Sequence, residues 1–290
     1  MTAFREINYK QDIKEIVALI RANLDTQFSE EFFKWKHIDN PFGKSLGLVA
    51  IEDNKIVGLR MFMRWEFSKN NGAVIKALRP VDTVVDKEYR GQGLFKKLTL
   101  KGLANFENEY NLIFNTPNIN SLPGYLKMGW EKMEKPGFFR IAICNPMRKH
   151  VSYNLIESKE INLHKENTPA LNNTNRTESY LRWRYKDQKY EIASFKDGTY
   201  VFFKKFLFKS FPAIMIFDIK QFKLDTSFYY NSLAIQYKRP LIYYLGNLKD
   251  SNRNFLVNFK SKTPVIVYRN DDFNIFEDII FDLGDVEGIL

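Results

Sequence analysis

The first candidate for chemistry is the glycine-containing turn Arg90-Gly91-Gln92-Gly93-Leu94-Phe95. Residues 81–85 before it are mostly β-branched and favour a strand. Apolar side chains after it recur at the spacing of an amphipathic helix. A glycine turn that leads into a helix leaves backbone N–H groups unpaired, and such a helix start binds phosphate. The turn is not a dinucleotide-binding GxGxxG motif, because position 96 is Lys96, and it is not a P-loop, because no GK[ST] follows.

A second segment lies one helix and one strand further along and contains Asn118, Ser121, Tyr125 and Gly129-Trp130. Together the two segments resemble the GNAT acyltransferases. The pyrophosphate loop of that family follows [Q/R]-x-x-G-x-[G/A]; Arg90 and Gly93 match it, whereas Phe95 departs from it. We expect Phe95 to donate its backbone N–H and to begin the apolar face of the helix. The family then has an Asn, a short helix with a Tyr, and a Gly-Phe pair, positions that are filled here by Asn118, Ser121, Tyr125 and Gly129-Trp130.

The resemblance covers residues 1–145. The stretches FNTPN and PGYLKMGW are also similar to family members that are found among surface-polysaccharide genes.

The resemblance implies that acetyl-CoA is the co-substrate. Its pyrophosphate would be held by backbone N–H groups of Arg90, Gly91, Gln92, Gly93, Leu94 and Phe95. Its pantetheine arm would pair with the backbone of Thr83, Val84 and Val85, with Asn118 and Ser121 also along the CoA arm. Tyr125 would be the general acid that protonates the leaving thiolate, a role worth roughly 10²–10⁴-fold in rate.

Asp82 is the candidate general base, acting on the amine directly or through water. Ideal strand alternation places Asp82 on the same face as Val84 and opposite Thr83. The structural alternative is an ion pair between Asp82 and Arg60 or Arg79. His37 is the other titratable candidate.

The composition limits the classes of ligand that the protein is expected to bind and the cellular compartment in which it is expected. A net charge of +10 suits an anionic ligand such as CoA or a nucleotide-linked substrate. The absence of an arginine-rich arm or an aromatic RNA-binding motif disfavours nucleic acid. The single Cys144 excludes an intrachain disulfide and a cysteine-based metal site, and we expect no metal. No signal core or bilayer-length apolar run is present, which favours the cytoplasm.

Local signals predict an α/β chain with a mixed sheet, in the order β-α-α-β-β-β-α-β-α-β. Helices are expected after Asp12 and Ser29, over residues 93–110 and over 122–128. Strands are expected over residues 4–7, 46–51, 56–67, 73–85, near 112 and over 138–143.

The second half of the chain repeats the first. Residues 30–39 align with 178–187 at an offset of 148, which pairs Trp35 with Trp183 and His37 with Tyr185 and favours packing roles for these side chains. The prediction is a tandem GNAT-like fold with a degenerate second copy, because the strand at 213–218 is followed by no glycine turn. We expect a catalytic domain over 1–145, a connector with one helix over 146–177, and a degenerate domain over 178–290.

The functional hypothesis is an N-acetyltransferase that transfers acetyl from acetyl-CoA to a primary amine by direct attack. An amino sugar or nucleotide-linked amino sugar is the candidate acceptor. Two alternatives stay open: an aminoacyl-tRNA-dependent transferase of the tandem GNAT type, and a non-catalytic CoA-binding or scaffold protein. A monomer is favoured, since an internal repeat can replace a dimer.

Overall fold

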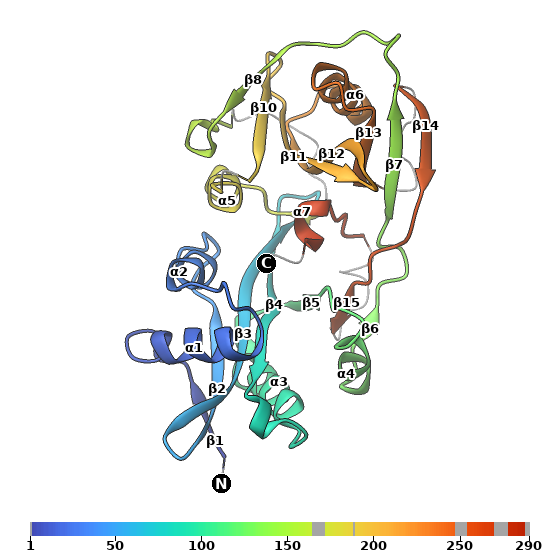
Figure 1. Cartoon of the computed structure of the whole chain (residues 1–290). Helices are drawn as coiled ribbons and strands as arrows, with labels where there is room; N and C mark the ends of the chain where they lie inside the picture. The colour runs from blue at the N-terminus through green and yellow to red at the C-terminus, as the bar shows by residue number, and fades with distance from the viewer. Residues whose placement is uncertain (1, 164–171, 188, 247–253, 270–277, 288–290) are drawn as a thin grey trace.

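The computed structural model describes residues 2–163, 172–187, 189–246, 254–269 and 278–287. Each half of the chain contributes most of one mixed sheet, and the two sheets lie one above the other in Figure 1. In spatial order, the first sheet contains β1 (Ala3–Glu6), β2 (Leu46–Glu52), β3 (Lys55–Ser68), β4 (Val74–Val85), β5 (Leu112–Asn115), β15 (Val267–Arg269) and β6 (Glu131–Lys132). The short strand β9 (Asn173–Thr174) pairs with β3.

The second sheet has the same arrangement. Its spatial order is β8 (Tyr153–Ile156), β10 (Glu191–Phe195), β11 (Tyr200–Phe208), β12 (Phe211–Lys220), β13 (Leu241–Gly246), β7 (Phe138–Cys144) and β14 (Phe255–Lys260). In both sheets the fourth and fifth strands are parallel and their other neighbours are antiparallel. The mixed α/β fold with two related copies is therefore confirmed.

The sixth strand of each sheet comes from the opposite half of the chain. Strand β7 precedes the connector but lies between β13 and β14, whereas β15 follows the second copy but lies between β5 and β6. The expected boundary at residue 145 follows the sequence repeat, but the sheets do not divide there. A final strand was expected near residues 138–143 and is present, although in the other sheet, because the two copies exchange these strands.

Helices cover both faces of the first sheet. Helices α1 (Ile13–Asn23) and α2 (Glu30–His37) contribute to one buried cluster, and α3 (Leu94–Asn105) contributes to another with the short helix α4 (Leu122–Lys127). Ser29 Oγ accepts a hydrogen bond from Phe32 N and caps α2, as predicted. Asp12 precedes α1 without capping it, because its carboxylate accepts from Arg5 and from Asn8 N.

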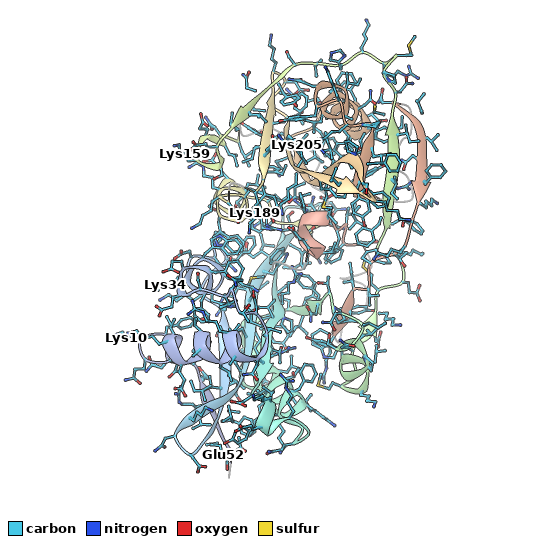
Figure 2. All side chains as sticks on the ribbon, viewed as in Figure 1. Lys10, Lys34, Glu52, Lys159, Lys189 and Lys205 are labelled. Carbon is cyan, nitrogen blue, oxygen red and sulfur yellow. The ribbon has the colours of Figure 1, made fainter. Side chains whose placement is uncertain are left out.

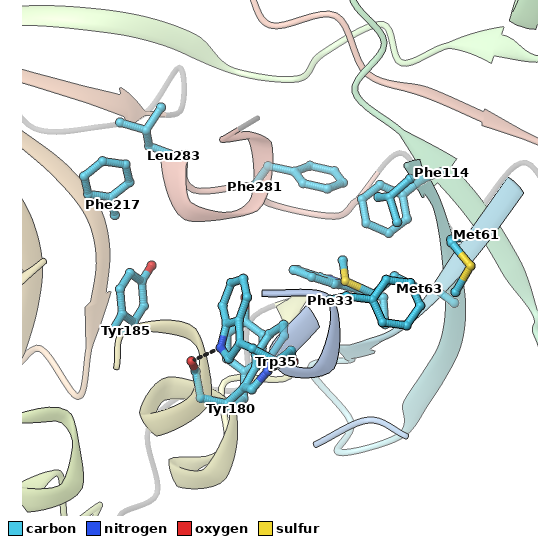
Figure 3. Close-up of a cluster of buried hydrophobic side chains, with 14 of the residues drawn as sticks. Phe33, Trp35, Met61, Met63, Phe114, Tyr180, Tyr185, Phe217, Phe281 and Leu283 are labelled. Carbon is cyan, nitrogen blue, oxygen red and sulfur yellow. Dashed lines mark hydrogen bonds between the residues drawn. The ribbon is translucent and has the colours of Figure 1, made fainter. Parts of the chain in front are cut away.

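The second sheet carries α5 (Glu178–Arg184) and α6 (Thr226–Gln236), while α7 (Leu283–Val286) packs against β12. The largest buried cluster draws on both halves, as Figure 3 shows for Trp35, Tyr180, Phe217 and Phe281. In the connector, the described residues form β8, a 3₁₀ turn (Ser158–Glu160) and β9; the expected α-helix is not among them, because residues 153–156 extend the second sheet as its edge strand.

Lysines such as Lys10, Lys34 and Lys189 project from the surface of both halves (Figure 2), in keeping with the net charge of +10. Among the described helices, none has the length and apolar character that crossing a membrane would require.

Candidate functional site

A cavity of about 610 Å³ opens where β4 and β5 separate. These parallel strands pair only at Ala77 with Leu112 and at Leu78 with Ile113. Beyond these pairs, the two strands line the cavity from opposite sides. The β4 side consists of Pro80, Val81, Asp82 and Thr83. The other side consists of Asn115, at the end of β5, and of Thr116, Pro117, Asn118, Asn120 and Ser121, in the segment that follows. The divergence of the two strands therefore creates the space for a ligand.

A β-bulge shapes the β4 side of this cavity. Val84 pairs with Leu59 and Val81 pairs with Met61, so Asp82 and Thr83 together face Arg60 alone. Asp82 has φ +44°, outside the extended region. Both Asp82 and Thr83 line the cavity, so the alternation expected of an ideal strand does not hold here.

Asp82 is held by side chains from α2. Its Oδ1 lies 2.9 Å from Lys36 Nζ, and its Oδ2 lies 2.7 Å from His37 Nε2. The alternative of an ion pair with Arg60 or Arg79 was therefore wrong in its partners, because the bulge turns the carboxylate toward Lys36 and His37 of α2. Burial favours a raised pKa for Asp82, but the Lys36 ammonium and the His37 hydrogen bond outweigh it and hold that pKa well below its usual range.

His37 completes this group. It is fully buried, and burial lowers its pKa despite the neighbouring carboxylate. The neutral ring at pH 7 donates from Nε2 to Asp82 and accepts at Nδ1 from Ser45 Oγ, which lies 2.9 Å away. The ring contacts Phe33 on its other side, so His37 both packs in the core and orients Asp82.

Tyr125 lies on the opposite wall of the cavity, in α4. Its hydroxyl oxygen accepts hydrogen bonds from Arg60 Nη2 at 2.6 Å and from Asn115 Nδ2 at 2.5 Å. A phenol oxygen has two lone pairs and one proton. Since both lone pairs are used, the proton is left for a third partner on the cavity side.

A second cavity of about 510 Å³ lies against the glycine turn. Gly91 and Gly93 have φ of +81° and +73°, and Gly93 precedes α3 as its N-cap residue. The lining contains eight of the residues expected along the donor: Thr83, Val84, Val85, Arg90, Gly91, Gly93, Leu94 and Phe95. Gln92 is exposed and, among the described residues, is not part of either lining. The two cavities share Leu24, Thr83 and Phe95.

Phe95 was expected to be the first core residue of the helix, and this was wrong. Helix α3 begins at Leu94, so Leu94 and Leu98 form its buried face and Phe95 is rotated toward the cavities. Its ring lies 5.4 Å from the Arg60 guanidinium carbon and 5.9 Å from the Tyr125 ring centroid. The Phe95 side chain thus forms a wall that both cavities share.

Asn118 and Ser121 line the larger cavity, but their hydrogen bonds in this structure are local. Asn118 Oδ1 accepts from Asn120 N, Ser121 N and Ser121 Oγ at 3.0–3.1 Å. These bonds fold the segment that connects β5 to α4. Among the described residues, His, Cys, Asp and Glu side chains form no group of three suited to a metal ion.

Three residues that contact the site were not predicted from the sequence, Lys36, Ser45 and Asn115, and Arg60 was predicted only as a partner of Asp82. A signal existed for Arg60, because it is a charged residue within the apolar strand LRMFMRW. Asn115 is the last residue of β5, yet Asn118 was chosen from the segment that follows the strand. Lys36 carries no local signal, since only the bulge in β4 brings Asp82 to it, and Ser45 reaches the site only through its hydrogen bond with His37.

In the second copy an aspartate lies in the equivalent strand and has an equivalent hydrogen-bond donor, but the surrounding residues differ. The Tyr185 hydroxyl donates to Asp218 in β12, as His37 donates to Asp82 in β4. Arg176 binds both Asp218 and Asp285, at 2.6 and 2.8 Å. Helix α6 is capped by Asp225, whose carboxylate accepts from Ser227 N and would repel a phosphate.

Comparison with protein families finds that residues 3–133 match the acetyltransferase (GNAT) domain. Comparison with curated proteins gives no match.

Among solved structures, this chain is similar to a probable N-acyltransferase from Enterococcus faecalis V583, with 14% identity, a TM-score of 0.69 and coverage of 95% of this chain and 74% of that one. It is also similar to a GCN5-related N-acetyltransferase from Anabaena variabilis ATCC 29413, with 13% identity, a TM-score of 0.68 and coverage of 93% and 72%. A third similar structure is Eis1 from Mycobacterium abscessus, with 10% identity, a TM-score of 0.66 and coverage of 93% and 73%.

Proposed function

Because residues 3–133 are an acetyltransferase domain of the GNAT superfamily, we propose that this acyltransferase moves an acetyl group from acetyl-CoA to a primary amine. The observation that carries the proposal is the junction of two cavities at Thr83 and Phe95. One cavity contains the glycine turn, and the other contains Tyr125 and Asp82. A donor along β4 would therefore bring its thioester to the point where the acceptor enters.

In this proposal the neutral amine nitrogen attacks the thioester carbon, and a tetrahedral intermediate forms, whose positively charged nitrogen releases one proton to water. As the C–S bond breaks, Tyr125 transfers its hydroxyl proton to the sulfur and CoA leaves as the thiol. The hydrogen bonds from Arg60 and Asn115 support this role, since they leave that proton free to face the cavity.

In this proposal the carboxylate of Asp82 would bind the ammonium group of the acceptor. Because its pKa is held well below the usual range, its carboxylate is charged throughout the neutral range. We infer that it holds the incoming ammonium group and passes its proton through water to solvent, which leaves the neutral amine to attack. Replacement by Asn would raise the KM for the amine more than the KM for acetyl-CoA.

We further propose a hydroxylated acceptor of the amino-sugar class, free or nucleotide-linked, that is acetylated by a cytoplasmic monomer. The acceptor cavity is lined by amides and hydroxyls that suit sugar hydroxyl groups: Asn115, Thr116, Asn118, Asn120 and Ser121. Aminohexoses, their nucleotide-linked forms and simple alkylamines would be compared as acceptors by release of free thiol.

Calorimetric titration of acetyl-CoA into the protein and into Gly93→Trp tests the donor site. Wild type should bind, and Gly93→Trp should not, because Gly93 has φ +73° and lines the cavity. Gly72→Trp is the matched control: Gly72 has φ +82°, has equally open space around it and lies on an exposed turn. Absence of binding to both acetyl-CoA and CoA in wild type would contradict the proposal, and aminoacyl-tRNA would be tested next.

A further inference from the structure

Arg60 is a buried cation beside the proposed reaction centre. It is 1% exposed, and its guanidinium donates from Nη2 to Tyr125 and from Nη1 to Thr83 Oγ1. Within the described part of the chain, its Nε has no hydrogen-bond partner and no carboxylate forms an ion pair with it. Asp82, its neighbour across the bulge, is already bound by Lys36 and His37. The guanidinium is instead surrounded by the rings of Phe62, Phe95 and Tyr125, at 5.4–5.6 Å.

Such a site is costly for a resting protein. A buried charge without a counter-ion loses the solvation that water would provide, and contacts with aromatic rings recover only part of that loss. The arrangement becomes favourable when a negative charge develops next to the guanidinium. Arg60 lines the acceptor cavity and contacts two oxygens there, those of Thr83 and Tyr125; only the Tyr125 oxygen gives up a proton in the proposed reaction.

We propose that Arg60 is the counter-ion of the tyrosinate that Tyr125 becomes during each turnover. This inference rests on the proposed acetyl transfer. When the C–S bond breaks, the Tyr125 O–H bond breaks and an S–H bond forms, which leaves the negative charge on the phenol oxygen. Arg60 and Asn115 then hold that oxygen with two hydrogen bonds, one of them from a cation, until water returns the proton. In the resting enzyme the same two bonds aim the proton at the sulfur.

Arg60 therefore acts through Tyr125 as a positioning residue, and a double-mutant cycle tests this. Arg60→Gln should lower kcat by about 10- to 100-fold, the usual range for a hydrogen bond to a charged group, with the Kd for acetyl-CoA unchanged. In a Tyr125→Phe background the same substitution should cost nothing further, because no tyrosinate forms. Arg60→Lys keeps the positive charge and one donor, so its kcat should lie between those of wild type and Arg60→Gln. If Arg60→Gln does not fold, Arg60→Lys takes its place in the cycle.

Arg79→Gln is the matched control. Arg79 is equally buried, in the adjacent strand β4, and its Nη2 binds Thr116 Oγ1, but its guanidinium lies over Trp65 and Phe114. Its effect on kcat should add to that of Tyr125→Phe. Two outcomes would overturn the proposed role of Arg60 and leave the proposed function standing. One is that the losses of kcat caused by Arg60→Gln and Tyr125→Phe are additive. The other is that Arg60→Gln weakens acetyl-CoA binding and leaves kcat unchanged. A wild-type protein that binds CoA but releases no thiol with any amine would overturn the proposed function itself.

Discussion

Trp35 and Trp183 hydrogen-bond to each other across the two copies of the fold. The indole Nε1 of Trp35 donates to the Trp183 carbonyl at 2.9 Å, and the Nε1 of Trp183 donates to the Trp35 carbonyl at 2.7 Å. Their rings stack with centroids 5.1 Å apart. Equivalent residues of a repeat can meet reciprocally only near a local twofold axis, so helices α2 and α5 form a pseudo-symmetric interface within one chain.

Trp183→Phe should destabilise the protein by about 1–3 kcal/mol, because it leaves the buried Trp35 carbonyl without its donor. Trp35→Phe should have a similar effect, and the double variant should lose less than the sum, because the two rings also stack. Denaturant unfolding measures each loss. Trp130→Phe is the control, since Trp130 is buried but its Nε1 has no hydrogen-bond partner among the described residues. An equal loss in Trp130→Phe would show that ring volume, not the reciprocal bond, carries the effect.

The sequence was sufficient to predict that Trp35 and Trp183 are equivalent and buried, and the order of most elements, but not that the two residues contact each other. The correspondence of Trp35 with Trp183 came from an offset of 148, and helices α2 and α3 appear where they were expected. These features depend on local periodicity and on self-similarity, which one chain contains. The exchange of β7 and β15 could not be predicted, because local signals mark a segment as a strand without saying to which sheet it belongs.

The sequence predicted which segments of the chain form the site better than it predicted the contacts between their side chains. The glycine turn and Tyr125 lie at the two cavities because motif order fixes them along the chain. The partners of Asp82 escaped prediction, since one extra residue in β4 reverses the direction of every side chain after it. Phe95 was misplaced in part: α3 begins at Leu94, so Leu94 is the buried residue, and Phe95 packs at the edge of the core and lines both cavities.

Tyr125→Phe should reduce kcat by about 10²–10⁴-fold, the range of a lost general acid, with little change in acetyl-CoA affinity. The ring keeps its contacts with Phe95 and Trp130, so packing is preserved. Steady-state rates and calorimetric Kd values separate the two effects. Tyr180→Phe is the control, because its buried hydroxyl has no hydrogen-bond partner among the described residues. A Tyr125→Phe enzyme with wild-type kcat would exclude Tyr125 as the acid.

His37 should make the protein lose stability as the pH falls below about 6.5, the ordinary pKa of histidine. Burial lowers the pKa of His37 in the folded state, so the unfolded chain binds the proton at a higher pH than the folded chain. Asp82 contributes no change in this window, because its own pKa lies well below it. The free energy of unfolding of wild type should therefore decrease from pH 7 to pH 5.

His37→Gln isolates this effect, because Gln does not titrate. The advantage of wild type over His37→Gln should shrink steadily as the pH is lowered from about 7 to 5. Denaturant unfolding at several pH values gives the comparison. An advantage that grows on acidification would mean that His37 is charged in the folded protein and paired with Asp82.

The strand exchange predicts that neither half of the chain folds by itself. A fragment of residues 1–145 lacks β15, so β5 and β6 lose the strand that joins them. A fragment of residues 146–290 lacks β7, so β13 and β14 separate in the same way. In the intact protein these losses are avoided because each copy supplies the missing strand of the other, and the two sheets should unfold in one cooperative transition.

Co-expression of the two fragments, divided within the exposed loop that follows β7, should restore a complex that co-purifies and binds acetyl-CoA. Each fragment expressed alone should lack a cooperative thermal transition by circular dichroism. The exchanged strands are the reason for this expectation, since each fragment carries a strand that only the other can pair. A fragment of residues 1–145 that melts cooperatively and binds acetyl-CoA alone would show that β7 can return to its own sheet, and the exchange would then be dispensable for the donor site.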